Sequence, residues 1–250
     1  MPTDRTTHLP QVVCSPAATS AALEVMLLLR RLMVWLFVLV VALGVLRELA
    51  LPLMSDELAA RVKHLRHFSP NGEHNLPTWF TAVIMALAAL LSALMWRLER
   101  ARGGSLAGYW AGLALIMLLM SVDEAVSFHE AFVTIFAFMG AWSPWLHFAW
   151  VVPGMLLVLI VGLIYLRFLW RLPRPVALYL LASGLIFLSG ALVLEMVDGW
   201  VLRTWGEDSV QYTIGYVFED TLEMIGIMLF NFTVMDLLRQ HGSEDPRQTA

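Results

Sequence analysis

The chain has 250 residues, of which 59% are hydrophobic and only 14% are charged. Soluble domains carry about 25% charged residues, so this composition indicates that lipid is the main solvent of the fold. The net charge of −4 gives no basic surface for nucleic acid. The single cysteine, Cys14, excludes an intramolecular disulfide and a cysteine-based metal site.

Six segments are apolar over a length that suits a membrane-spanning helix, which needs about 20 residues. In chain order they are residues 32–53, 79–96, 106–130, 145–166, 176–198 and 214–235. The sequence therefore predicts an all-α integral membrane bundle of six helices over residues 23–240. Pro153 and Gly154 predict a kink in the fourth helix. Residues 1–22 and 241–250 are expected to be disordered tails.

Basic residues gather in the segments that lie on one side of this bundle. They are Arg5, Arg30 and Arg31 before the first helix, Arg97, Arg100 and Arg102 after the second, Arg167, Arg171 and Arg174 after the fourth, and Arg239 and Arg247 after the sixth. Cytoplasmic loops carry an excess of Lys and Arg. We therefore expect a multi-pass protein of the bacterial inner membrane, with both termini in the cytoplasm.

Three of the predicted helices carry acidic residues near one end. They are Asp123, Glu124 and Glu130, with His129, on the third helix, Glu195 and Asp198 on the fifth, and Glu219, Asp220 and Glu223 on the sixth. The third and fifth helices run outward and the sixth runs inward. All three groups are therefore predicted at a similar depth in the outer leaflet.

Helical geometry also directs these groups toward a common interior. At 100° per residue, Asp123 and Glu130 lie within about 60° of each other on the third helix. Glu195 and Asp198 are about 60° apart on the fifth helix. Glu124 and His129 flank the face of the third helix on opposite sides.

Carboxylates in a membrane require a neutralising partner, since one acidic side chain at the bilayer centre costs about 2.5–3.5 kcal/mol. Arg47 and Arg203 reach the group only from its rim and are too few to offset it. Protonation, water and bound cations remain. Oxygen ligands with an imidazole favour a divalent ion such as Fe, Mn or Zn, whereas an all-oxygen site would suit Ca or Mg.

The nine residues divide into two predicted roles. We expect the metal ligands to be Asp123, Glu130, Glu195, Glu219 and Glu223. Further ligands, groups that orient the ligands or a general base are expected among Glu124, His129, Asp198 and Asp220. The alternative is that the acids lie on solvated helix ends and pair with loop arginines. His147 is predicted to be an interfacial histidine rather than a metal ligand. Trp145, Trp150 and Trp200 are typical of an aromatic belt.

The acidic pattern resembles that of a known group of sequences. Asp123-Glu124 with His129-Glu130, then Glu195 with Asp198, then Glu219-Asp220 with Glu223, is similar to a group of bacterial membrane proteins of unassigned function. The resemblance covers the third to sixth helices and implies no activity. The chain lacks the paired histidines that alkaline-ceramidase-like membrane hydrolases have in their late helices, so it is not placed with them.

Three functions are compatible with such a site. The first is a metal-dependent membrane enzyme for a lipid or other apolar substrate, in which the metal activates water or polarises an ester or phosphate, or supports oxygen chemistry at a di-iron centre. The second is a cation-coupled or proton-coupled transporter, although the chain shows no internal repeat of the kind common in transporters. The third is a non-catalytic accessory subunit or sensor.

Overall fold

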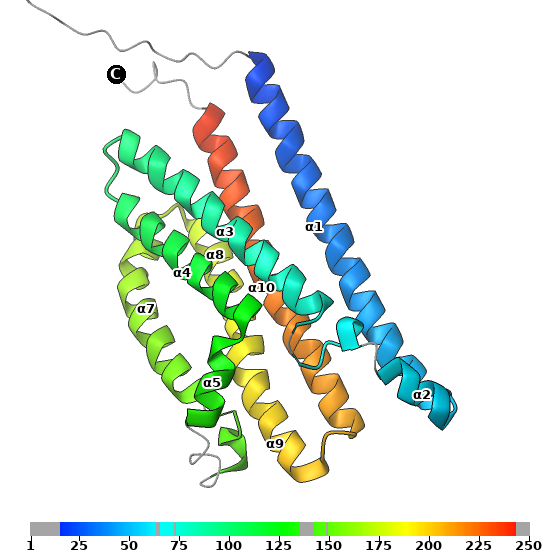
Figure 1. The fold of residues 1–250 in the computed structure, drawn as a ribbon. Coiled ribbons are helices and arrows are strands. Elements are labelled where there is room, and N and C mark those ends of the chain that lie inside the picture. Colours follow the sequence, from blue (N-terminus) through cyan, green and yellow to red (C-terminus); the bar gives the residue numbers. More distant parts are fainter. Residues whose placement is uncertain (1–15, 64–65, 73, 136–142, 149, 244–250) are drawn as a thin grey trace, which may run out of the picture.

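The computed structural model describes residues 16–243, apart from 64–65, 73, 136–142 and 149. All the regular elements within these residues are helices (Figure 1). Six of the helical stretches are long and apolar enough to cross a membrane, as the sequence predicts. They are α1 (Pro16–Ala50), α3 (Leu76–Ala101), α4 (Ala107–Val126), α7 (Val151–Arg171), the stretch formed by α8 (Arg174–Leu188) with α9 (Glu195–Trp205), and α10 (Val210–Ser243).

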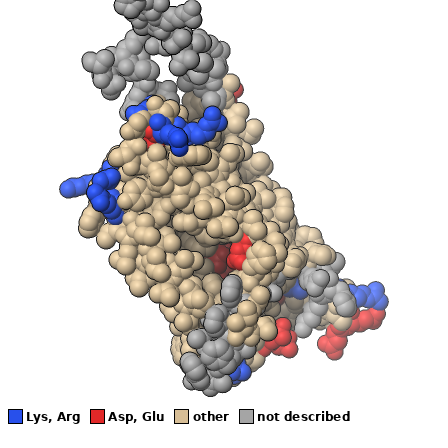
Figure 2. All heavy atoms as spheres, turned by 60° about the vertical axis from the view of Figure 1, so that its left-hand side comes forward, with Lys and Arg blue, Asp and Glu red and all other residues tan. Residues whose placement is uncertain are grey.

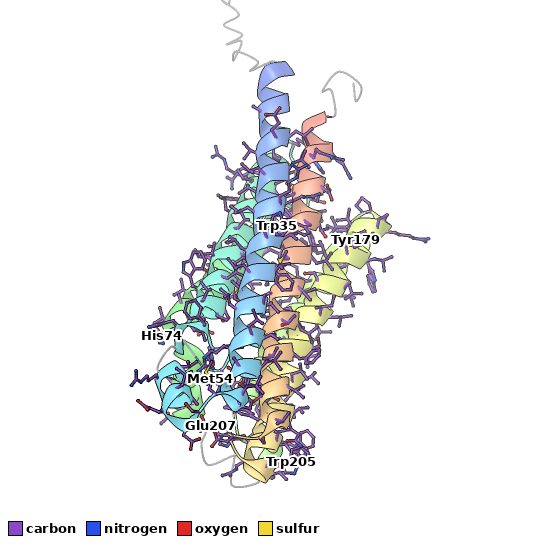
Figure 3. The ribbon with its side chains drawn as sticks, turned by 90° about the vertical axis from the view of Figure 1, so that its right-hand side faces the viewer. Trp35, Met54, His74, Tyr179, Trp205 and Glu207 are labelled. Atoms are coloured by element: carbon purple, nitrogen blue, oxygen red, sulfur yellow. The ribbon has the colours of Figure 1, made fainter. Side chains whose placement is uncertain are left out.

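The start of α1 and the end of α10 lie at the same end of the bundle (Figure 1). Short helices lie at the other end, among them α2 (Asp56–Lys63) and α5 (Phe128–Ile135). Figure 3 places Met54, His74, Trp205 and Glu207 toward that second end. An even number of long helices is consistent with the start of α1 and the end of α10 lying at the same end of the bundle.

Helices α3 and α10 form the centre of the bundle, and α1, α4 and α8 pack against them. Apolar side chains from α3 and α10, such as Phe80, Met95 and Met224, are almost fully buried there. Three buried polar side chains donate hydrogen bonds to backbone carbonyls of a neighbouring helix: Ser121 to Ala82 at 2.8 Å, Ser183 to Gly226 at 2.8 Å, and Asn231 to Ile84 at 2.9 Å. Such bonds hold helices together in lipid, where apolar surface alone gives little attraction.

The third span is shorter than predicted, because its helix stops before the acidic group ends. Ser127 adopts the left-handed conformation, with φ of 59°, and its N–H donates to the carbonyl of Asp123. The chain then restarts as α5 in a new direction. The prediction of one continuous helix over 106–130 is therefore wrong at Ser127.

The fourth span also differs from its predicted bounds. A short 3₁₀ turn, Pro144–Leu146, precedes α7, which begins at Val151 and runs to Arg171. Pro153 lies in the first turn of α7, where its missing N–H has no helical partner to lose. The predicted kink at Pro153 is therefore wrong, and residues 145–148 and 150 are not part of the long helix.

The two predicted tails are partly helical. Helix α1 starts at Pro16, within the segment 1–22 that was expected to be disordered. Helix α10 continues to Ser243, past the predicted boundary at 241. Residues 1–15 and 244–250 lie outside the described part of the chain.

Candidate functional site

The break at Ser127 turns His129 back toward Asp123. One carboxylate oxygen of Asp123 accepts the backbone N–H of His129 at 3.0 Å, and the other lies 3.1 Å from the ring Nδ1 of His129. A bond at Nδ1 fixes the orientation of the imidazole and leaves Nε2 as its second functional atom. Asp123 is therefore placed to orient His129, and both of its oxygens are engaged.

This geometry corrects the helical-face argument for the third span. The angles that grouped Asp123 with Glu130 assumed an unbroken helix, and the helix is broken between them. The same angles placed His129 to one side, whereas it contacts Asp123 directly. The side chain of Glu130 lies outside what the structure describes, so its predicted role as a ligand stays a prediction.

Glu195 begins α9, directly after a π-helical segment, Ser189–Leu194, that interrupts the fifth span. Single-turn π segments within α-helices are frequent at functional sites. The Glu195 carboxylate accepts the indole N–H of Trp150 at 3.1 Å. The Trp150 ring in turn packs against the ring of His129, with centroids 5.4 Å apart. These contacts join the third, fourth and fifth spans at one point.

Helix α10 approaches the π-helical segment very closely, and glycine makes this approach possible. A Cβ atom on Gly190 would lie 2.8 Å from the carbonyl oxygen of Glu219 and 2.9 Å from Cγ of Glu223. Any larger residue at 190 would push the two helices apart. Gly190 therefore brings the acidic residues of α10 next to those of α9.

Asp198 is the most enclosed of the acidic residues, with an exposed fraction of 1%. It packs against Gly215 of α10, where an added Cβ would collide with the carboxylate. Neither carboxylate oxygen accepts a hydrogen bond from a donor group. The carboxyl group of Glu219 lies within hydrogen-bonding reach of it, and the two can bond only if one of them carries a proton. A buried carboxylate without a donor is costly, so this position calls for a proton or a cation.

The remaining acids of α10 complete the group. The carboxyl of Glu219 lies within hydrogen-bonding reach of the carboxyls of Glu195 and Asp198. Glu223 is close enough to interact electrostatically with Glu124, Asp220, Glu195 and His129. The structure thus brings together the acidic groups of the third, fifth and sixth spans.

These residues line one end of a cavity of about 870 Å³. Seven acidic side chains contribute to its wall: Asp123, Glu124, Glu195, Asp198, Glu219, Asp220 and Glu223. Among the described residues, no Lys or Arg lines it. Figure 2 shows acidic atoms at the bottom of a hollow in the side of the bundle, surrounded by uncharged residues.

Away from the acids the cavity is apolar. Its wall there comes from α4, α7 and α8, with residues such as Leu113, Val158 and Leu185. The lining on α7 extends from Trp150 to Leu169. At about 1.5 Å per residue this stretch is roughly 28 Å long, close to the thickness of a hydrocarbon core, about 30 Å.

Arg47, one of the two arginines predicted at the rim of the acidic group, pairs with an acid that does not line the cavity. Arg47 is largely buried and forms an ion pair with Glu48, its neighbour in the chain. Ser69 donates a further hydrogen bond to Glu48 at 3.4 Å. Arg47 is therefore committed to an ion pair with Glu48, which does not line the cavity.

His147 lies just before α7, beside Gly199 of α9. Burial lowers the pKa of His147 below its usual value, and Arg203 lowers it further, while Glu195 acts in the opposite direction. His147 therefore favours its neutral form. It does not line the cavity.

The described side chains do not form a ready ligand set, because no three His, Cys, Asp or Glu among them lie at distances that would hold a metal ion. A cation would have to draw the flexible carboxyls of Glu195, Glu219 and Glu223 inward by rotation of their side chains. The metal-ligand and catalytic roles of the nine predicted residues therefore stay predictions.

Sequence reasoning missed the aromatic part of the site. Trp150 was assigned to an aromatic belt, yet it donates to Glu195 and lines the cavity. Tyr212 and Tyr216, one turn apart at the start of α10, also line it. Their position one and two turns before Glu219 on the same helix was the signal available in the sequence.

Six apolar spans around an acid-lined cavity are features of a multi-pass membrane protein. The family described as a domain of unknown function (DUF8692) matches residues 31–238, and the chain belongs to that family. Neither a curated protein nor a solved structure matches the chain.

Proposed function

We propose that the protein is a membrane-embedded enzyme that acts on an amphipathic lipid, with a divalent cation held among the carboxylates of its cavity. The acidic end of the cavity would lie in the outer leaflet of the inner membrane and both termini in the cytoplasm. Fe, Mn or Zn would suit a site that combines carboxylates with His129.

The cavity is the observation that supports this function. It joins a polar end, where seven acidic side chains lie, to an apolar part, and its whole lining along α7 has a length close to the thickness of the hydrocarbon core. A lipid has the same division between a polar head and an apolar chain. The hollow in the side of the bundle would admit such a molecule from the bilayer (Figure 2).

The contacts suggest how the acidic residues divide their work. Glu219 contacts Glu195 and interacts electrostatically with Glu223 across α9 and α10, so these three are the proposed cation ligands. Asp123 would orient His129, whose Nε2 then serves as a ligand or a general base. A cation there would polarise an ester or phosphate and lower the pKa of a bound water.

Thermal melting in detergent tests the cation directly. Because a ligand of the folded state stabilises it, a chelator should lower the melting temperature, and added Mn²⁺, Fe²⁺ or Zn²⁺ should restore it. Glu223→Gln should weaken both responses. Glu207→Gln is the matched control, since Glu207 is exposed in the turn between α9 and α10 (Figure 3). Melting that responds neither to chelator nor to added cations would contradict the proposal.

A proton-coupled or cation-coupled transporter is the second candidate. Two observations favour it: the carboxyls of Glu219, Glu195 and Asp198 are close enough to share protons, and the fifth span is interrupted beside them. Transporters often bind ions at broken helices. Insensitivity to chelator, together with proton uptake by the protein in sealed vesicles, would support this function over the enzyme.

A further inference from the structure

The acidic end of the cavity is walled by aromatic rings as well as by carboxylates. Phe148, Trp150, Tyr212 and Tyr216 all line it. Trp150 is held in place by its hydrogen bond to Glu195 and its contact with His129. Tyr212 and Tyr216 pack edge to face, 5.4 Å apart. Aromatic faces attract organic cations, and ammonium groups are often bound by such rings.

The charge of the wall selects the same kind of ligand. Seven acidic side chains line the cavity, and none of the described lining residues is Lys or Arg. One bound divalent cation would offset two of those charges. The wall would remain negative, so it would repel a phosphate or carboxylate head group and attract a positive one.

Asp198 supplies an independent indication of a ligand. It is 1% exposed, it lines the cavity, and among the described residues its only polar partner is another acid, the carboxyl of Glu219. An ammonium group carries N–H donors together with positive charge. It would satisfy such an acceptor and stabilise the neighbouring carboxyl of Glu219 at the same time.

We propose that the substrate of this cavity is an amphiphile with a cationic amino head group. The head lies beside Asp198 and the Trp150 ring, next to the carboxyls that would hold the cation, and the apolar chain extends along α4, α7 and α8. This inference rests on the proposed function and names the substrate class of the same site.

Binding of four probes with one chain length tests the head group. Octadecylamine, octadecanol, octadecanoate and octadecyl phosphate are compared by native mass spectrometry of the detergent-solubilised protein at neutral pH. The amine should bind at least about tenfold more tightly than the alcohol, which corresponds to about 1.4 kcal/mol. The two anionic probes should bind more weakly than the alcohol.

Variants show whether this preference comes from the cavity. Glu223→Gln and Trp150→Leu should each lower the affinity for octadecylamine by about tenfold and leave that for octadecanol unchanged. Two variants are used so that a folding defect in one, detected by melting, leaves the other informative. Glu207→Gln is the control for a general loss of negative charge, because Glu207 is exposed and lies outside the cavity wall.

Equal affinities for the amine and the alcohol would overturn the inference, as would an equal loss in Glu207→Gln. Tightest binding by octadecyl phosphate in the presence of Mn²⁺ would also overturn it, while supporting the cation of the proposed function. Tightest binding by the amine in a protein that does not respond to chelator would support the inference and count against the metal.

Discussion

Helices α3 and α10 form one half of the bundle, and α4 and α7 belong to the other. The two halves are similarly apolar, but their residues are buried to very different extents. Over the most apolar stretches of α3 and α10, 56% and 61% of the residues are buried, whereas the share is 11% in α4 and in α7. The mean hydropathy of α7 is nevertheless 2.3, against 2.0 for α3. The packed half acts as a scaffold, and the loosely packed half leaves room for the cavity. Apolarity therefore identifies the six long helices, whereas the apolar part of the cavity follows from the loose packing of α4 and α7 against the rest of the bundle.

The largest effect is expected from a cavity created in the scaffold. Phe80 of α3 is 1% exposed, so Phe80→Ala should lower the free energy of unfolding by about 3 kcal/mol, because the surrounding helices cannot fill the space. Leu157 of α7 is 61% exposed and lines the cavity, so Leu157→Ala should change it little. Chemical unfolding in detergent micelles measures both. Equal losses would remove the distinction between the halves.

A smaller effect is expected where two helices touch through glycine. A Cβ on Gly226 would lie 2.6 Å from the backbone nitrogen of Phe187, so Gly226→Ala should separate α8 from α10 and cost about 2 kcal/mol. Gly184 on α8 has open space around it and is the matched control. Melting temperatures should fall for Gly226→Ala alone. A similar fall for Gly184→Ala would show that the close approach at Gly226 is not the cause, since helix propensity alone favours Ala over Gly.

At the acidic end of the cavity, a substitution should raise the stability of the protein instead of lowering it. Asp198→Asn keeps the shape of the side chain and removes a charge next to Glu219, so in chelator it should raise the stability by about 1 kcal/mol. With Mn²⁺ present, the same variant should gain less from the cation than the unaltered protein. Asp208→Asn, exposed in the turn after α9, is the control. Destabilisation by Asp198→Asn in chelator would indicate that Asp198 is paired in the folded protein.

The smallest effect concerns His147. In the folded protein, burial lowers the pKa of this histidine below its usual value of 6.5. The unfolded chain binds the proton more tightly, so the contribution of His147 to stability is complete above about pH 6.5 and is lost as the pH falls toward the lower folded value. His147→Gln should therefore reduce the drop in melting temperature between pH 7.5 and pH 5.5. His67→Gln, at an exposed position, should leave the drop unchanged.

Much of the fold follows from the sequence, because bilayer thickness sets the length of an apolar helix. The described residues contain six helices that are long and apolar enough to cross a membrane, as predicted. The bounds of the third span are not confirmed, since Ser127 is a residue whose left-handed conformation no periodicity reveals. The π-helical segment at Ser189–Leu194 is likewise invisible to an argument that assumes 3.6 residues per turn.

The sequence predicted which acidic residues come together at the site, but not the partners of their side chains. Shared depth in the membrane was enough to group Glu195, Glu219 and Glu223 from two spans. Side-chain partners depend on local geometry, so the pairing of Asp123 with His129 and the bond from Trp150 to Glu195 had no sequence signature. Packing also decides which acid is enclosed, and only the structure places Asp198 against Gly215.

Elemental analysis of protein purified without chelator tests the central claim, that the converging carboxylates hold a divalent cation. About one or two transition-metal ions per chain are expected, the content of carboxylate sites in di-metal helical bundles. A Glu219→Gln, Glu223→Gln double variant should lose that metal, and Glu207→Gln should retain it. A folded wild-type protein that contains no metal and takes up no Mn²⁺, Fe²⁺ or Zn²⁺ would contradict this claim.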